Sequence, residues 1–597
     1  MSRPMRRFRV PAIALFVLGC ASAQGVGGFA YYGITHTSWW YDEYTYPAAT
    51  LSRNDLAATN ANWAGVLVTW YQTSLTANVI VGSFPPDTQN PGGGAAPSPP
   101  PPPPYQTPTD AAVTQAIQEF HSHGIKVMLK PHVDVNDGAG SWRGNITPSD
   151  PDAWFASYTA FLVRYAQLAE SLGVEMLCIG TELKSVSGAA NQARWYRVID
   201  AIRAVYSGTL TYAANATSAG DEFTAVSFWD RLDVIGLDSY FALTNKSDPT
   251  LAQLVAAWRQ NSGHLDLVAT VTNFYNAHQK PIVFSEIGYK SSAGANTEPW
   301  NYSHVGAYDP TEQRNCIDAA FTVWSQWSSW MRGFFWWDWP VAAPSATDTD
   351  YNPRGKPAAD LLRAWQSLPD PRNAVTNAAS YRADRVAPGG IVNVFGAGLA
   401  AGTSQYSAIP LPTLLGDTTV TFNGIAAPLY FASPQQVNAQ MPFEVAAGGA
   451  IAEVISKSGM ALTQLTVAAA GPGVFTLDGS GTGDAAAIDA VTYAPVSASQ
   501  PIAAGGYLGV FCTGLGAVVP AGATGAAPAS PPPQTAVKPG VLIDGQSAAL
   551  LWAGLAPGFV GLYQVNTQVP VTLSTGSHRL QVVVNGAASN TVTFSVR

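Results

Sequence analysis

Two glutamates directly follow short apolar runs of the kind that form buried strands. Glu182 lies in the segment IGTEL (179–183), and Glu286 lies in FSEIGY (284–289). A carboxylate in such a place loses hydration, and that cost requires a compensating role. One glutamate of this kind is more often a structural hydrogen-bonding group, but two at one mouth of a barrel can flank a bond from two directions. Hydrolysis of a glycosidic bond uses this pair: a protonated acid and a carboxylate.

Further polar residues stand where strands are expected to end. Tyr240 follows the sixth apolar run, where it either donates a hydrogen bond to Glu286 and keeps it ionised or packs as a core tyrosine. His132 and Lys130 follow the third run, and we expect them to bind sugar hydroxyls. Asn215 ends the fifth run, where a hydroxyl contact and a turn role are equally open. No other histidine stands at ligand spacing from His132, so we expect no metal there. Hydrolysis by a pair of carboxylates requires no cofactor, and we expect none.

Tryptophan is concentrated in one part of the chain. The sequence has 18 tryptophans, and all except Trp552 lie within the first 365 residues. Trp336 and Trp337 are adjacent in an expected strand, and neighbouring strand residues point to opposite faces. One of them should therefore be a sugar platform and the other a core residue. Trp39 and Trp40 invite the same division.

The elements that must position these residues alternate regularly. Continuous apolar runs suit strands that are buried on both faces, and parallel strands need a crossover, usually a helix. Eight strand-helix repeats predict a (β/α)8 barrel with its site at the carboxyl ends of the strands; a doubly wound open sheet is the alternative. The expected strands are 32–35, 66–70, 127–129, 176–179, 210–213, 234–237, 282–284 and 333–336.

Two of the intervening helices carry clear boundary signals. Asp110 is an expected N-cap for a helix that stops at Gly124, and Asp150 is an expected N-cap for a longer helix closed by Gly173. Between the second and third strands, segment 82–109 contains a proline run, 99–104. Because prolines cannot donate backbone hydrogen bonds, this segment is an exposed loop that either rims the site or is a passive insertion.

The chain begins with a segment typical of export. Arginines precede an apolar stretch, and small residues then offer a cleavage site, so 1–23 is predicted to be a signal peptide and the protein to be secreted. Cys20 offers the alternative of a lipid-anchored protein. The remaining cysteines, Cys178, Cys316 and Cys512, are too scattered for a disulfide framework and are expected to be buried.

The composition changes once along the chain, after the expected barrel at 24–368. From about residue 374 short alternating strands with Gly-rich turns take over, and three landmarks recur in the same order. We expect two Ig-like β-sandwiches, 374–472 and 473–597, acting as a spacer or in attachment to a cell surface or matrix. They resemble a C-terminal module of unassigned function on secreted soil-bacterial proteins. The repeated landmarks are 394–399 with 510–515, 423–424 with 544–545, and 436–442 with 564–570.

Charge excludes one class of partner. The net charge is -9, charged residues make up only 12% of the chain, and no basic patch appears beyond residue 9. Nucleic-acid binders usually carry such a patch, so no nucleic-acid partner is expected. Beyond the signal segment no run of 18 apolar residues occurs, so the mature chain is not expected to cross a membrane.

The barrel segment, about 30–365, resembles the retaining glycoside hydrolases of clan A and, within that clan, glycoside hydrolase family 113, the β-mannanases. The resemblance implies that Glu182 is the acid/base and Glu286 the nucleophile. Most clan members have Asn before the acid/base; this chain has Thr181, as family 113 does. The segments that carry the resemblance are 33–34, 39–40, 68–72, 128–134, 142–144, 180–183, 238–241, 286–289 and 336–337.

The resulting hypothesis is a secreted retaining glycoside hydrolase, similar to endo-β-1,4-mannanases. It would cleave β-1,4-linked mannan or glucomannan by a two-glutamate double displacement, with a polysaccharide or oligosaccharide as its substrate. The first alternative is the same chemistry on another β-glycan, such as β-glucan. The second is a non-catalytic protein that binds carbohydrate or acts in adhesion.

Overall fold

A computed structural model describes residues 28–84, 106–218, 220–366 and 374–597. The predicted signal peptide, 1–23 with Cys20, lies outside these residues, as does most of the proline-rich segment 82–109. Two compact units make up the described chain, Gly27–Ser367 and Leu368–Arg597.

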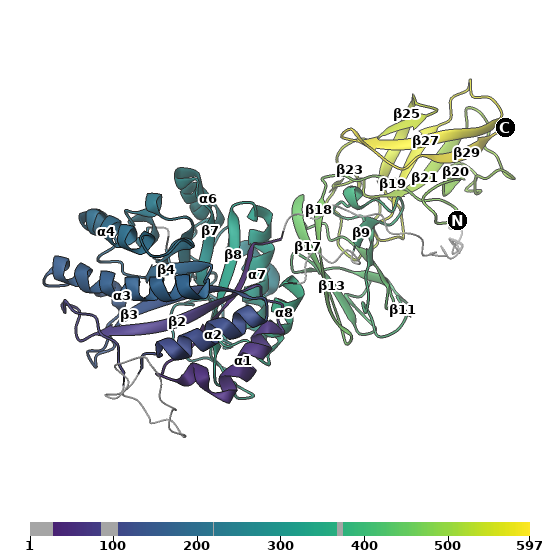
Figure 1. Cartoon of the computed structure of the whole chain (residues 1–597). Helices are drawn as coiled ribbons and strands as arrows, with labels where there is room; N and C mark the ends of the chain where they lie inside the picture. Colours follow the sequence, from purple (N-terminus) through teal and green to yellow (C-terminus); the bar gives the residue numbers. More distant parts are fainter. Residues whose placement is uncertain (1–27, 85–105, 219, 367–373) are drawn as a thin grey trace. The chain divides into compact units, whose positions relative to one another are not determined.

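The first unit is a closed barrel of eight parallel strands in the order β1 to β8 (Figure 1). Each strand contains the greater part of one of the predicted apolar runs, so the predicted (β/α)8 barrel is confirmed and the open sheet is wrong. The strands are β1 Tyr31–Thr37, β2 Trp63–Gln72, β3 Lys126–Val135, β4 Met176–Thr181, β5 Thr209–Ala216, β6 Ile235–Ser239, β7 Ile282–Ile287 and β8 Met331–Pro340.

Helices surround the barrel strands, as Figure 1 shows. The α-helices are α1 Pro47–Ala57, α2 Asp110–Ser122, α3 Pro151–Leu172, α4 Gln192–Arg203, α5 Leu251–Ala257, α6 Leu267–His278, α7 Pro310–Trp324 and α8 Pro357–Gln366. Short 3-10 helices lie at η1 Glu43–Thr45, η3 Arg143–Asn145, η4 Ala189–Asn191, η5 Glu222–Thr224, η6 Trp229–Arg231, η7 Ser325–Trp327 and, in the second unit, η8 Ala383–Arg385.

The helix boundaries follow the sequence signals with one correction. Helix α3 begins after Asp150, whose carboxylate accepts from two backbone N–H groups, and ends at Gly173 in the left-handed conformation. Helix α2 is capped by Thr109 and not by the predicted Asp110. Asp110 instead forms an ion pair with Arg164 of α3, 2.7 Å away, and this tertiary contact takes the carboxylate from the capping position.

Apolar side chains contributed by most of the barrel strands fill the interior. They form one buried cluster, so the polar groups of the barrel gather where the strands end. The cluster consists of Trp63, Met128, Met176, Cys178, Ala213, Val234, Val283 and Phe335.

The second unit is all-β, as predicted, and its sequence repeat is a structural repeat. In the first copy β10 pairs antiparallel with β16, and in the second copy β21 pairs antiparallel with β26. Asn423-Gly424 and Asp544-Gly545 both form turns with positive φ, as hairpins of this type require. The Ig-like subtype of these modules stays a prediction.

The strands of the second unit form separate sheets for each copy. In the first copy the sheets are β11-β15-β16-β10-β9 and β12-β13-β17-β18 with β14; in the second copy β19 to β29 form one continuous sheet. Their bounds are β9 Ala374–Asn377, β10 Ile391–Phe395, β11 Ser404–Gln405, β12 Leu414–Leu415, β13 Thr418–Phe422, β14 Ile425–Ala426, β15 Leu429–Ala432, β16 Gln436–Gln440, β17 Gly448–Ser456, β18 Gly459–Val467, β19 Gly473–Val474, β20 Ala487–Asp489, β21 Tyr507–Thr513, β22 Val518–Val519, β23 Gln534–Thr535, β24 Gly540–Ile543, β25 Gln546–Leu555, β26 Tyr563–Gln568, β27 Gly576–Val584, β28 Ala587–Ala588 and β29 Val592–Val596.

In the described parts of the chain, Cys178, Cys316 and Cys512 are buried free thiols. No helix among the described residues has both the length and the apolar character that spanning a membrane demands.

Candidate active site

Glu286 lies near the end of β7 and is held by two hydrogen-bond donors. The Lys130 ammonium contacts its Oε1 atom, and the Tyr240 hydroxyl donates to its Oε2 atom over 2.9 Å. Lys130 lies in the middle of β3, and Tyr240 directly follows β6. The predicted hydrogen bond from Tyr240 is therefore present, and the carboxylate is fixed with both oxygens engaged.

Lys130 is a partner of Glu286 and not a sugar contact. Its side chain has no exposed surface and reaches both Glu286 and Asp238, whose Oδ2 atom is 3.4 Å from Nζ. Burial opposes the ammonium charge, but the two carboxylates outweigh burial and raise the pKa of Lys130. The prediction that Lys130 binds sugar hydroxyls is wrong, because the amine is enclosed by carboxylates.

Asp238 shares this ammonium group with Glu286. Burial, reinforced by the charge of Glu286, raises the pKa of Asp238 well above its ordinary value. Asp238 is fully buried, and the Ser285 hydroxyl donates to its Oδ1 atom over 2.8 Å. One cation with two buried carboxylates favours one negative charge on the pair of carboxylates.

His132 lies beside Glu286 with free hydrogen-bonding capacity. Its Nε2 atom is 3.9 Å from Glu286 Oε1, and among the described residues neither ring nitrogen has a hydrogen-bond partner. Burial, helped by the charges of Arg143 and Lys130, lowers the pKa of His132 well below its ordinary value. A neutral imidazole has one donor and one acceptor, and both are available to a sugar hydroxyl.

Glu182 directly follows β4 in the left-handed conformation, with φ of 52°. Its carboxylate accepts from Asn215 Nδ2 over 2.9 Å and from Trp142 Nε1 over 3.1 Å. Arg143 Nη1 lies 3.6 Å from its Oε2 atom and also binds Asp134. A non-glycine residue with positive φ is uncommon and is found where the surroundings enforce it, often at functional sites. Asn215 lies inside β5 and orients Glu182 through Nδ2, so the turn role is wrong, and a contact with a sugar hydroxyl stays a prediction.

A buried layer behind Glu182 fixes this arrangement. Glu222 Oε2 accepts from the Asn215 backbone N–H over 2.8 Å, and Glu222 Oε1 accepts from the Tyr212 hydroxyl over 2.6 Å. The Tyr212 hydroxyl in turn accepts from the Leu183 backbone N–H. Burial raises the pKa of Glu222 to about 7, although both hydrogen bonds oppose the shift. Glu222 thus ties together the backbone beside Glu182 and the residue that binds it.

The four predicted platform tryptophans divide unequally. Trp336 is only 2% exposed and packs on Phe321 and Phe334, so it is a core residue and not a sugar contact. Trp337 is half-buried, and its ring lies edge-on to that of Trp39, with 6.3 Å between the ring centroids. Trp39 and Trp40 are 36% and 38% exposed, so the predicted division of this pair into one platform and one core residue is wrong.

Sequence reasoning missed four residues as members of the site: Asp238, Trp142, Arg143 and Glu222. Asp238 had the same signal as the glutamates, a carboxylate at the end of an apolar run. Trp142 and Arg143 were noticed only as part of the family resemblance. Glu222 carries no sequence signal, because it reaches the site from η5 through the backbone of Asn215.

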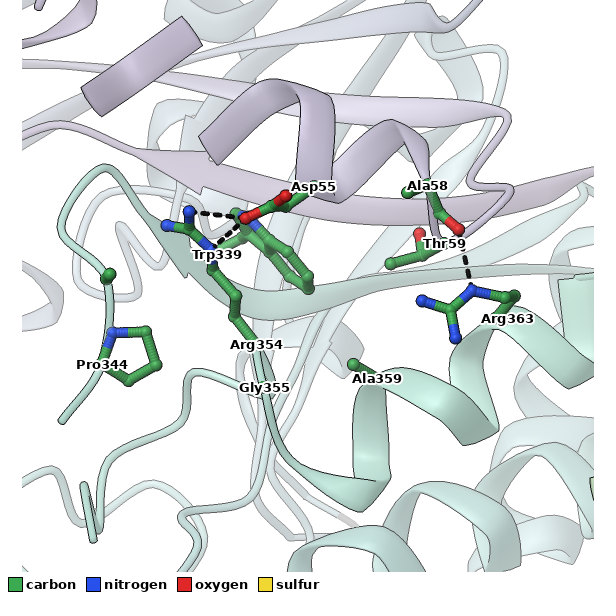
Figure 2. Close-up of a pocket in the computed structure, with 10 residues that line it drawn as sticks. Asp55, Ala58, Thr59, Trp339, Pro344, Arg354, Gly355, Ala359 and Arg363 are labelled. Carbon is green, nitrogen blue, oxygen red and sulfur yellow. Dashed lines mark hydrogen bonds and ion pairs between the residues drawn. The ribbon is translucent and has the colours of Figure 1, made fainter. Parts of the chain in front are cut away.

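A hollow of about 380 Å³ lies elsewhere on the barrel unit, where α1, the segment after β8 and α8 meet (Figure 2). Arg354 is paired there with Asp55, and Arg363 Nε donates to the carbonyl oxygen of Ala58. Neither catalytic candidate lines this hollow, so we assign the chemistry to the strand ends.

The comparisons with known proteins concern the barrel unit. A family model, Glycoside Hydrolase Family 113, matches residues 104–356, a range that includes both glutamates. No curated protein matches the chain.

Several solved structures resemble part of the chain. The GH113 β-mannanase AaManA from Alicyclobacillus acidocaldarius, in complex with ManMIm, is 27% identical, covers 57% of this chain and 97% of its own, and has a TM-score of 0.47. A complex of a GH113 β-1,4-mannanase is 23% identical, covers 57% of this chain and 100% of its own, and has a TM-score of 0.46. XacCel5A in complex with cellopentaose is 11% identical, covers 56% of this chain and 99% of its own, and has a TM-score of 0.36.

The family match spans the strands that carry Glu182, Asn215, Asp238, Tyr240 and Glu286. Residues 104–356 of the barrel unit thus match the model of glycoside hydrolase family 113, and the protein is a glycoside hydrolase.

Proposed function

We propose that the protein is a retaining β-1,4-mannanase in which Glu286 is the nucleophile and Glu182 the acid/base. The observation that carries this assignment is the difference between the partners of the two carboxylates. Glu286 is bound by a cation and a hydroxyl, which favour the ionised form that a nucleophile needs. Glu182 accepts hydrogen bonds from the neutral donors of Asn215 and Trp142, and the nearby cation Arg143 is farther off, at 3.6 Å, and is paired more closely with Asp134.

The first step forms a covalent glycosyl-enzyme. A Glu286 oxygen attacks the anomeric carbon while Glu182 gives its proton to the glycosidic oxygen, so that the C–O bond to the leaving sugar breaks and an ester bond forms. Charge is conserved, because the negative charge of Glu286 moves to Glu182. The unpartnered nitrogens of His132 supply a hydrogen bond to a hydroxyl of the sugar held at Glu286.

The second step releases that sugar. Glu182, now ionised, takes a proton from water while the water oxygen attacks the anomeric carbon and the ester bond to Glu286 breaks. Both residues return to their starting states, and the configuration of the anomeric carbon is retained. During the intermediate Lys130 loses its charged partner Glu286, and Asp238 is placed to release its proton to solvent and take over that role as a carboxylate.

The substrate class rests on the resemblance to β-mannanases in the barrel domain. We propose β-1,4-linked mannan or glucomannan, with Trp39, Trp40 and Trp337 offering exposed or half-exposed rings to sugar faces. Secretion follows from the predicted signal peptide at 1–23, with a lipid anchor on Cys20 as the other route. The tandem β modules are proposed to serve as a spacer or to attach the enzyme to a cell surface or matrix.

One assay series tests this function. Sugar release from glucomannan, galactomannan and mixed-linkage glucan is measured for the wild type, for Glu286→Ala and Glu182→Ala, and for the control Glu170→Ala on the exposed side of α3. Release from the two mannans should fall at least about 1,000-fold in Glu286→Ala and stay unchanged in the control. Activity on glucan alone would remove mannan as the substrate, and full activity of Glu286→Ala would remove Glu286 as the nucleophile.

A further inference from the structure

Trp142 is a large aromatic residue that is held in place and yet exposed. It lies in the connection between β3 and α3, just before η3, and is 37% exposed. Its benzo ring packs directly on Gly144, where an added Cβ would come within 2.3 Å of the ring. A surface tryptophan with a fixed ring contact on one part and free surface on the rest is suited to binding a flat apolar face.

The turn that carries Trp142 is fastened to the segment that follows Glu182. The carbonyl oxygen of Gly144 accepts from the backbone N–H of Ser185 over 3.0 Å and from the Ser185 hydroxyl over 2.8 Å. The indole N–H then donates to Glu182 Oε2. The two hydrogen bonds between Ser185 and Gly144, together with the bond from the indole, therefore fix Trp142 relative to Glu182.

The chemistry of Glu182 defines what lies next to Trp142. As acid, Glu182 must touch the glycosidic oxygen, and this oxygen leaves with the sugar on the reducing side of the cleaved bond. A pyranose ring has faces rich in C–H groups, which pack on aromatic rings. The exposed part of Trp142 is adjacent to the place that this leaving sugar must occupy.

We propose that Trp142 forms the binding site of the leaving-group sugar, with its exposed ring as the platform and its N–H holding the acid/base in line with the glycosidic oxygen. This inference rests on the proposed function, because it uses Glu182 as the acid. It assigns to one side chain both recognition of the departing sugar and orientation of the proton that releases it.

Two substitutions separate the two roles. Trp142→Phe keeps an aromatic ring and removes the N–H, whereas Trp142→Ala removes both. Trp330→Phe is the matched control, because Trp330 stacks on Tyr275 and directly precedes β8, at the end of the barrel opposite to the glutamates. Thermal unfolding of each variant establishes that it is folded.

Two substrates separate leaving-group binding from the rest of catalysis. Mannopentaose places a sugar on the leaving side and requires a proton, whereas β-mannobiosyl fluoride places no sugar there and its fluoride departs with little acid assistance. For Trp142→Ala, kcat/KM on mannopentaose should fall about 30-fold and stay within about threefold on the fluoride. Trp330→Phe should leave both values unchanged.

The pH profile tests the N–H separately. The charged groups that face Glu182 are Arg143, in the same connection, with Glu222 and Asp238 farther off; the indole is a neutral donor among them. Loss of this donor destabilises the ionised carboxylate, so the alkaline limb of kcat/KM on mannopentaose should move to higher pH in Trp142→Phe. Its kcat should fall about tenfold while KM stays close to the wild-type value.

The outcomes are distinguishable from failure of the proposed function. Equal losses on both substrates in Trp142→Ala would overturn the platform, and an unmoved pH profile in Trp142→Phe would overturn the orienting role. If the wild type cleaves mannan and Trp142→Ala is as active as the wild type, this inference alone fails. If the wild type does not cleave mannan, the proposed function fails with it.

Discussion

At the residue scale, the site is organised around one buried cation that serves two carboxylates. Lys130 contacts Glu286 and Asp238, and burial together with the charge of Glu286 raises the pKa of Asp238 well above its ordinary value. When Glu286 becomes an ester, its charge is gone and Lys130 needs another anion. Asp238, whose Oδ2 atom already lies 3.4 Å from Lys130 Nζ, becomes that anion when it releases its proton to solvent.

Substitution of Asp238 tests this exchange of partners. In Asp238→Asn the ammonium of Lys130 has no anionic partner once the ester has formed, so the intermediate is destabilised and the first step, which forms it, should become slow. We expect kcat to fall about tenfold or more with no pre-steady-state burst of leaving group. Ser285→Ala, which removes only a hydrogen bond to Asp238, is the milder comparison. A burst of leaving group in Asp238→Asn would contradict the exchange.

His36 carries a pH dependence of stability. Its Nδ1 atom donates to the carbonyl oxygen of Trp339 over 2.8 Å, and burial lowers its pKa to about 3. The unfolded chain takes up a proton near pH 6.5 while the folded chain does not, so the stabilisation is complete above pH 6.5 and is lost as the pH falls towards 3. Between pH 7 and pH 4 the loss amounts to about 3 kcal/mol.

The variant His36→Asn isolates this effect, because its amide can still donate to Trp339. The difference in free energy of unfolding between wild type and variant should shrink by about 3 kcal/mol from pH 7 to pH 4. Glu222 and Asp338, with pKa values raised to about 7, act in the opposite sense and cancel in this difference. A difference that is constant over this pH range would be inconsistent with a buried neutral His36.

Part of the site could be predicted from the sequence because its residues follow the apolar runs that form the barrel strands. Glu182, Glu286 and Tyr240 were found because each follows an apolar run, and the barrel topology brings strand ends together. Lys130 was misassigned because its burial depends on Asp238, which comes from a strand three positions along the barrel. Glu222 could not be predicted as part of the site, because it accepts from the backbone N–H of Asn215 and no sequence pattern indicates such a contact.

At the element scale, α1 and α2 are joined by a buried ion pair. The Arg53 side chain is fully buried, its Nε donates to Glu119 over 2.7 Å, and its Nη1 donates to the carbonyl oxygen of Tyr44. Glu119 lies on α2 and remains partly exposed. Removing the carboxylate leaves a buried guanidinium without its counter-charge, which is the costly way to break such a pair.

Glu119→Ala should therefore lower the free energy of unfolding of the barrel by about 3 kcal/mol, measured by chemical denaturation. The double variant Arg53→Met with Glu119→Ala should recover part of this loss, because no charge is then left buried. Asp360→Ala breaks an exposed pair with Arg363 and should change stability by less than about 0.5 kcal/mol. A loss of similar size in Glu119→Ala and Asp360→Ala would show that the Arg53 pair is not critical.

Element boundaries were predictable where local signals were unopposed. Asp150 and Gly173 bound α3 because no other group competes for them. At α2, Thr109 and Asp110 are both good capping residues, and Arg164 decided between them by pairing with Asp110. Such a choice depends on a neighbouring helix and is invisible to reasoning from the local sequence.

At the scale of the whole molecule, the described chain has two compact units. The barrel and each of the two β modules have a hydrophobic core of their own. The barrel is one unit, and both β modules belong to the other. Within that unit hydrogen bonds join the two modules: the Leu411 N–H donates to the carbonyl oxygen of Gly525 over 2.8 Å, and the Ile391 N–H donates to the Thr513 hydroxyl over 2.7 Å. Contacts of this kind couple the unfolding of neighbouring domains.

Calorimetry of the full chain should accordingly show two unfolding transitions and not three. One transition belongs to the barrel and should rise in temperature when mannooligosaccharide is added, because ligand binds only the folded barrel. The other belongs to the two β modules together and should not respond to the sugar. A third, separate transition would show that the modules fold independently of each other.

The central claim is that Glu286 forms the covalent intermediate, and trapping that intermediate tests it most directly. The wild type is incubated with 2-deoxy-2-fluoro-β-mannobiosyl fluoride, whose good leaving group permits the first step and whose fluorine slows the second. The mass of the intact chain and of its peptides then identifies the esterified residue. One adduct per chain on the peptide that contains Glu286 is the predicted result, and an adduct on Glu182 or on any other residue would contradict it.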